Sequence, residues 1–198
     1  MNPLSNTGSP SNGNLTSNGL NDIASTIGVS TGKWYSECSI GSTSGLVHLG
    51  VVANDGKGFL HTGNTNWAVG GSGNTPGSIF IRSDNSGGNY GGGMYTRTSS
   101  PNLVGLSSAG LGYQGDTTMV EGDVVSIELN LDANPNYAKF YVNNTLVANY
   151  TNLVYTGSLF FYNRNNSGGT STFNFGQKPF KYAPPQDRDW ETVYTRFV

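Results

Sequence analysis

Residues 121–144, EGDVVSIELNLDANPNYAKFYVNN, carry the clearest structural signal in this sequence. From Val124 to Asp132 apolar and polar residues alternate, which is the period of a strand with two different faces. The turn-forming residues 133–136 lead into a second strand, rich in aromatic residues, over Tyr137 to Val142. Asn143-Asn144 tolerates the positive φ angles of a tight turn, so the chain should return over Thr145 to Asn149. These features predict an antiparallel three-stranded meander.

Further strands are predicted before and after this meander in the sequence, because apolar and polar residues alternate there and turn-forming residues separate the segments. Their ranges are 23–29, 33–40, 46–53, 78–82, 158–162 and 171–175, with a weaker signal at 14–17. We expect 23–29 and 33–40 to pair around Ser30-Thr31-Gly32. We also expect Phe173 and Phe175 to pack between two sheets, against the apolar strand face that contains Val125.

Composition limits both the class of fold and the class of partner. The chain has 198 residues with 29 glycines and 11% charged residues, which suits one all-β domain of short strands and tight turns. Its net charge of −2 and lack of a basic run exclude nucleic acid as a partner. No apolar stretch approaches the roughly 20 residues of a membrane span, so we expect a protein that is soluble when isolated. Cys38 is the only cysteine, which excludes an internal disulfide and favours a buried core thiol.

Several short motifs together resemble the SPRY family. They are Gly32-Lys33-Trp34-Tyr35-Ser36-Glu37, Leu49-Gly50-Val51-Val52, Gly122-Asp123-Val124-Val125, Phe140-Tyr141-Val142-Asn143-Asn144 and the run from Asn174 to Phe180. The likeness extends from about Thr26 to Pro185, and the lead-in from Thr26 to Tyr35 is similar to SPRY-like domains of bacteriophage structural proteins. This resemblance implies a two-sheet antiparallel β-sandwich of the concanavalin A-like or SPRY jelly-roll type. It also implies a place in the virion, as a tail fibre or capsid-associated component.

The resemblance also suggests how the chain is organised. Residues 1–185 are expected to form a single domain. Residues 1–21 are either a disordered leader or the first strand region that closes the sandwich. Residues 186–198 depart from the pattern of the phage relatives, which suggests a truncated or altered C-terminal tail.

Candidate catalytic and metal sites are weak. Glu128, Asn130 and Asp132 share a strand face as the carboxylates of related sandwich glycosidases do, but the middle residue is an amide and Asp132 is a short replacement for Glu. A hydrogen-bonded or solvated strand face explains the same pattern. Asp132, Asn134 and Asn136 have calcium-loop spacing without the required Gly and Glu, and His48 and His61 lack a third ligand. We therefore expect no enzyme activity, no metal and no cofactor.

The longest irregular region, 84–110, is where we expect binding, together with its neighbouring loops such as 54–77, because long loops in compact domains are often functional. Their aromatic and arginine residues, with two from later loops, form the candidate ligand-binding set: Trp67, Tyr90, Tyr95, Arg97, Tyr113 and Arg164. Rings with a polar tip and bidentate guanidinium groups suit a protein or peptide partner, other virion subunits included. Two alternatives remain open at this stage. The set could bind host glycans as a lectin does, or several of its rings could cover the edge of the core.

Overall fold

The computed structural model describes residues 10–18, 21–43, 47–53, 78–82, 94–97, 103–104, 119–155, 157–165 and 168–182, and in this part of the chain the regular structure is entirely β. A six-stranded antiparallel sheet has the order β1-β13-β3-β8-β9-β10. Its strands are β1 (Thr16–Asn18), β13 (Thr170–Asn174), β3 (Lys33–Ser42), β8 (Val124–Asn130), β9 (Tyr137–Val142) and β10 (Thr145–Thr151).

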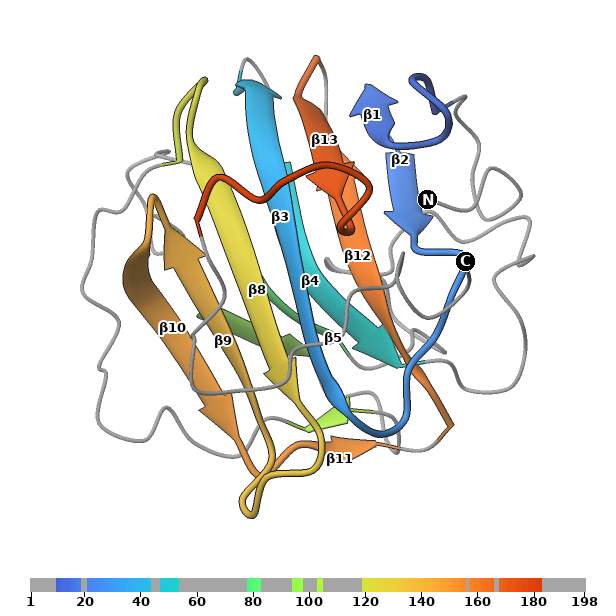
Figure 1. Cartoon of the computed structure of the whole chain (residues 1–198), viewed down its shortest axis with the longest axis vertical. Helices are drawn as coiled ribbons and strands as arrows, with labels where there is room; N and C mark the ends of the chain where they lie inside the picture. Colours follow the sequence, from blue (N-terminus) through green and yellow to red (C-terminus); the bar gives the residue numbers. More distant parts are fainter. Residues whose placement is uncertain are drawn as a thin grey trace.

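A five-stranded antiparallel sheet lies behind the first, with the order β2-β12-β4-β5-β6 (Figure 1). Its strands are β2 (Asn21–Ala24), β12 (Leu159–Asn165), β4 (Val47–Ala53), β5 (Ser78–Arg82) and β6 (Met94–Arg97). A short pair joins β11 (Val154–Tyr155) to β7 (Leu103–Val104). The predicted all-β, two-sheet antiparallel sandwich is therefore confirmed.

The meander read from residues 121–144 forms β8, β9 and β10, which are consecutive neighbours in the six-stranded sheet. Asn143 and Asn144 have φ angles of 47° and 66°, as a two-residue hairpin turn requires. The Asn143 side chain reinforces this turn, since its Oδ1 accepts from the Val124 amide at 3.1 Å and its Nδ2 donates to Asp123 at 2.7 Å. The turn residues and the alternation of the strands therefore favour the same pairing register of β8, β9 and β10.

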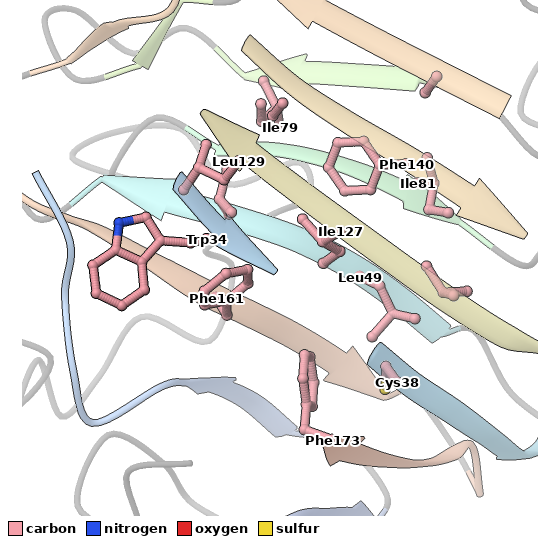
Figure 2. Packing of buried hydrophobic residues seen from close by; sticks show 14 of the residues in the cluster. Trp34, Cys38, Leu49, Ile79, Ile81, Ile127, Leu129, Phe140, Phe161 and Phe173 are labelled. Carbon is pink, nitrogen blue, oxygen red and sulfur yellow. The ribbon is translucent and has the colours of Figure 1, made fainter. Parts of the chain in front are cut away.

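The core fills the space between the sheets, as Figure 2 shows. The six-stranded sheet supplies alternate residues such as Ile127 and Phe140, and the five-stranded sheet supplies Leu49 and Phe161, all of them buried. Phe175 links the layers: its ring stacks on Phe173 at 5.0 Å and lies 5.8 Å from Phe161. The predicted meeting of Val125, Phe173 and Phe175 in one core is confirmed, and Cys38 is buried there too.

The predicted pairing of 23–29 with 33–40 is wrong. β2 pairs with β12, and Val29 exchanges two backbone hydrogen bonds of 2.8 Å with Leu159, whereas β3 lies between β13 and β8. The turn around Gly32 therefore carries the chain from one sheet to the other. A turn signal between two apolar runs does not distinguish a hairpin from such a crossover, because both bury one face of each strand.

Two segments predicted as irregular carry strands. Within 84–110 the chain forms β6 and β7, and β12 continues to Asn165, three residues beyond the end of the predicted strand 158–162. Within 1–21, the weak strand signal at 14–17 coincides with β1, which pairs with β13, and the hydroxyls of Thr16 and Thr172 lie 2.8 Å apart.

Candidate functional site

The candidate ligand-binding residues divide between the described strands and the rest of the chain. Trp67, Tyr90 and Tyr113 lie outside the described residues. Tyr95 and Arg97 lie on β6 and Arg164 on β12, so the prediction that these three are loop residues is wrong. The reason is that their strands are short or carry polar residues at inward positions, which hides the alternation of a strand.

Cross-strand register places these three residues on the same side of the five-stranded sheet. Leu49, Ile79 and Phe161 point into the core, so the alternate positions belong to the outer face, the side facing away from the six-stranded sheet. Paired positions form three rows across this face. The rows are Asp22, Arg164, His48 and Arg82; then Ala24, Tyr162, Gly50, Phe80 and Tyr95; then Phe160, Val52, Ser78 and Arg97.

Several arginines lie at outer positions of the five-stranded sheet. Of five arginines in the chain, the three that precede residue 183 all occupy its register positions: Arg82, Arg97 and Arg164. β12 and β6 are three strand spacings apart in the sheet order, which corresponds to about 14 Å. A guanidinium fork binds carboxylates in bidentate fashion and also stacks on aromatic rings. The register thus places three arginine positions on one face of this sheet.

Part of this face is already covered. Tyr162 is 0% exposed and His48 is 1% exposed, although both occupy outer positions. At Gly28 an added Cβ would lie 2.4 Å from the Phe160 ring, so this backbone packs directly on that ring. Arg164 is half-buried, and one of its terminal guanidinium nitrogens has no exposed surface. The sequence-based set did not include His48, Phe160 and Tyr162, which occupy outer positions in the register and are themselves buried.

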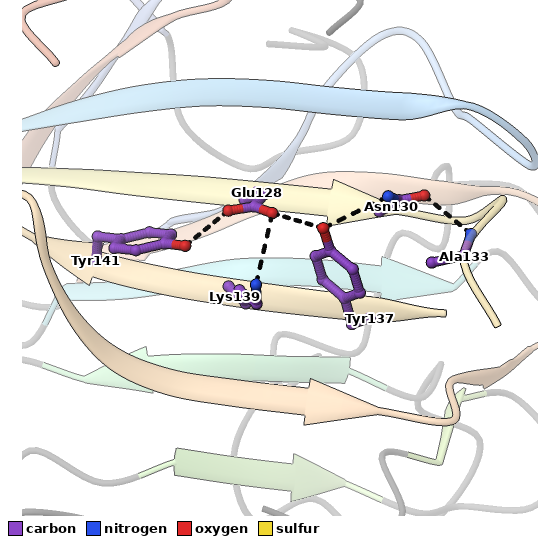
Figure 3. A network of polar contacts seen from close by, with 6 residues as sticks. All are labelled: Glu128, Asn130, Ala133, Tyr137, Lys139 and Tyr141. Carbon is purple, nitrogen blue, oxygen red and sulfur yellow. Dashed lines mark hydrogen bonds and ion pairs between the residues drawn. The ribbon is translucent and has the colours of Figure 1, made fainter. Parts of the chain in front are cut away.

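The opposite outer face, on the six-stranded sheet, holds a carboxylate network (Figure 3). Glu128 on β8 is 0% exposed and accepts two hydrogen bonds of 2.7 Å, from the hydroxyls of Tyr137 and Tyr141 on β9. The ammonium of Lys139 lies 3.8 Å from the same carboxylate and 4.5 Å from the centre of the Tyr137 ring. Burial, and then the neighbouring carboxylate, raises the pKa of Tyr141 above its ordinary value. The phenol therefore stays protonated and acts as a donor.

This geometry argues against the carboxylate pair considered for glycan cleavage. Both oxygens of Glu128 are engaged by phenols, and Asp132 accepts a hydrogen bond of 2.8 Å from the backbone amide of Gly32. Of the two explanations offered for this polar strand face, the hydrogen-bonded one applies, since Ser126, Glu128 and Asn130 are all buried.

The possible calcium loop is likewise occupied by hairpin contacts. Asn136 bonds the backbone of Leu153 through both side-chain atoms, at 2.7 and 3.1 Å. In the described part of the chain, no group of three His, Cys, Asp or Glu residues is placed to hold a metal ion. No described helix has the length and apolar character needed to span a membrane.

Comparisons with known proteins yield structural matches alone. No family model and no curated protein matches the chain. A human SPRY domain matches with a TM-score of 0.49 and 13% identity, covering 82% of this chain and 89% of that one. The SPRY domain of human HERC1 matches with a TM-score of 0.47 and 12% identity, covering 83% and 91%. At these values the likeness carries no conclusion about activity or partners, and the fold is established by the strand order above.

Proposed function

We propose that this protein is a non-catalytic interaction module that binds a protein or peptide at the outer face of its five-stranded sheet and the loops around it. The observation that carries the proposal is the convergence of Tyr95, Arg97 and Arg164. These residues come from segments far apart in the sequence, and the register brings all three to one face.

The chemistry of this face suits a partner with carboxylate and aromatic groups. Three arginines stand there in a chain whose net charge is −2, and one acidic position, Asp22, lies among the described outer positions of the same sheet. Clusters of arginine and aromatic residues are typical of the residues that contribute most binding energy at protein interfaces. The module belongs, in this proposal, to a bacteriophage virion protein such as a tail fibre or capsid-associated component, and the motifs from Thr26 to Phe180 support that setting. Trp67, Tyr90 and Tyr113 complete the proposed contact set.

Selection of a random peptide library on the immobilised full-length chain tests the proposal, with a glycan array run in parallel. We expect peptides enriched in Asp, Glu and aromatic residues, with affinities that fall about tenfold or more for Arg164→Ala, since truncating a principal contact costs at least ~1.4 kcal/mol. The matched control is Lys33→Ala, which removes a partly exposed cation from the other sheet. Binding that is indifferent to Arg164→Ala, Tyr95→Ala and Arg97→Ala, or hits confined to glycans, would refute the proposal; the second result would favour the lectin alternative.

A further inference from the structure

Residues 176–182, here called the crossing segment, follow the core residue Phe175 and lie across the outer face of the six-stranded sheet. Figure 1 shows this segment, in red, leaving β13 and passing in front of β3 toward β8. The segment adds no strand to the sheet, so it is held by individual contacts rather than by a ladder of backbone hydrogen bonds.

A single carboxylate on β3 makes the central contact. Glu37 is 4% exposed, and its two oxygens accept hydrogen bonds from consecutive backbone amides, Lys181 at 2.8 Å and Tyr182 at 2.7 Å. Bonds between a carboxylate and backbone amides are charge-assisted and are among the stronger hydrogen bonds in proteins. Glu37 therefore fixes the direction of the backbone at two adjacent residues.

Tyr35, two residues earlier on β3, adds an aromatic contact and a further backbone contact. Its ring meets that of Phe180 edge-on at 4.9 Å, and its hydroxyl donates to the carbonyl of Tyr182 at 3.1 Å. At the far end, the Tyr182 hydroxyl donates to Asn143 at 3.4 Å. Tyr35 and Glu37 together bind three main-chain groups and one ring, so they require an aromatic residue followed by two residues with free backbone groups.

The site exists independently of its occupant. β3 is an interior strand that pairs with β13 on one side and β8 on the other, so Tyr35 and Glu37 are positioned by the sheet rather than by residues 180–182. Their partners lie 144 to 147 residues further along the chain. Contacts of this kind, to main-chain groups and one aromatic ring, are available to any extended peptide of the same pattern.

We propose that Tyr35 and Glu37 form a peptide-binding site that the chain fills with its own Phe180-Lys181-Tyr182, and that a separate peptide with an aromatic residue followed by two residues with free backbone groups binds there when the crossing segment is displaced. The site lies on the opposite outer face from the proposed partner surface and does not depend on it.

A turn at the start of the crossing segment explains why the chain's own residues occupy the site. Asn174 donates to the carbonyls of Lys178 and Pro179 and accepts from the amide of Gly176. Gln177 bonds the backbone of Phe173 and Phe175. This preformed turn holds residues 180–182 close to Glu37, which gives them an effective concentration in the millimolar range or above. A free peptide therefore competes poorly against the intact segment.

Backbone substitution provides the sharpest test. Lys181→Pro removes the amide that donates to Glu37, and Lys181→Ala is the matched control because it keeps the amide and removes only an exposed side chain. A fluorescent peptide with the sequence of residues 176–185 is titrated into each full-length variant, and binding is followed by anisotropy. We expect binding to the Lys181→Pro protein and none to the wild type or Lys181→Ala at the same concentrations.

Two further measurements make the outcome decisive. Adding Glu37→Gln to the Lys181→Pro protein should weaken the peptide about tenfold or more, as loss of charge-assisted hydrogen bonds predicts. A peptide that itself carries proline at the position of Lys181 should not bind. If the Lys181→Pro protein does not fold, Phe180→Ala replaces it: this substitution removes the ring contact with Tyr35 and keeps the backbone, so it should weaken the hold on the segment, with Cys38 protection as the folding readout. Absence of peptide binding to a folded, released variant, or binding that Glu37→Gln leaves unchanged, would overturn the proposal, whereas Arg164→Ala should have no effect on it.

Discussion

Removing the tyrosine hydroxyls that bind Glu128 should destabilise the protein in a predictable order. Tyr137→Phe and Tyr141→Phe each delete one hydrogen bond of 2.7 Å to a carboxylate that is 0% exposed. A hydrogen bond to a charged group contributes about 1.5–3 kcal/mol, and a charge left short of donors in the interior adds to the loss. We expect about 2–3 kcal/mol for Tyr137, which is buried, and about 1.5 kcal/mol for Tyr141, which is partly exposed.

Lys139→Met provides the contrasting perturbation. The ammonium is 3.8 Å from Glu128 and its side chain is 24% exposed, so the ion pair should contribute less than about 1 kcal/mol. Urea denaturation of the three variants gives the free energies of unfolding, with Tyr155→Phe as a control whose hydroxyl donates to the Ser30 carbonyl in an exposed position. A neutral Tyr137→Phe, or a Lys139→Met cost larger than either tyrosine variant, would refute this account of how the buried carboxylate is stabilised.

Three further outcomes follow from the structure. Because Cys38 is 0% exposed and burial raises the pKa of its thiol, a thiol reagent at pH 8 should label it only after unfolding, and rapid labelling of the native protein would contradict the core assignment. Burial also raises the pKa of Tyr35 and Tyr141 above the ordinary 10.0, so their contribution to stability is complete below pH 10.0 and decreases as the pH rises above it. Urea midpoints between neutral and alkaline pH measure this effect, which should shrink in Tyr35→Phe. At Asn144, with a φ of 66°, substitution by Gly should be nearly neutral and substitution by Val should cost about 1–2 kcal/mol, as thermal or urea unfolding would report.

The parts of the fold that could be predicted are those where one local signal decides the structure. The alternation from Val124 onward and the Asn143-Asn144 turn together specify β8, β9 and β10, because strand period and turn geometry are local properties. The inward face of β3 could also be predicted from alternation alone, since Cys38 lies on the same face as Trp34 and both are in the core.

The parts that could not be predicted depend on contacts between distant residues. β12 has Asn163 and Asn165 at inward positions, which breaks the apolar pattern and made Arg164 read as a loop residue. These amides are tolerated in the interior because Asn165 donates to the Ser17 carbonyl at 2.8 Å and Asn163 to the His48 carbonyl at 3.2 Å. No local sequence pattern predicts that these backbone carbonyls will accept the hydrogen bonds.

The same limit applies to both candidate surfaces. Tyr95, Arg97 and Arg164 were selected as chemical types, but only the register of the five-stranded sheet places them on one face. The contact of Glu37 with the crossing segment joins residues 144 and 145 positions apart, and nothing near Glu37 in the sequence indicates it.

A double-mutant cycle between the sheets measures whether the two layers pack face to face, on which both candidate surfaces depend. Phe161 comes from the five-stranded sheet, and Phe175 directly follows β13 of the six-stranded sheet; their ring centres lie 5.8 Å apart. The account predicts a coupling energy of about 0.5–1.5 kcal/mol between Phe161→Leu and Phe175→Leu in urea unfolding, as for contacting aromatic pairs. Strict additivity of the two substitutions would show that these rings do not touch and would contradict the sandwich described here.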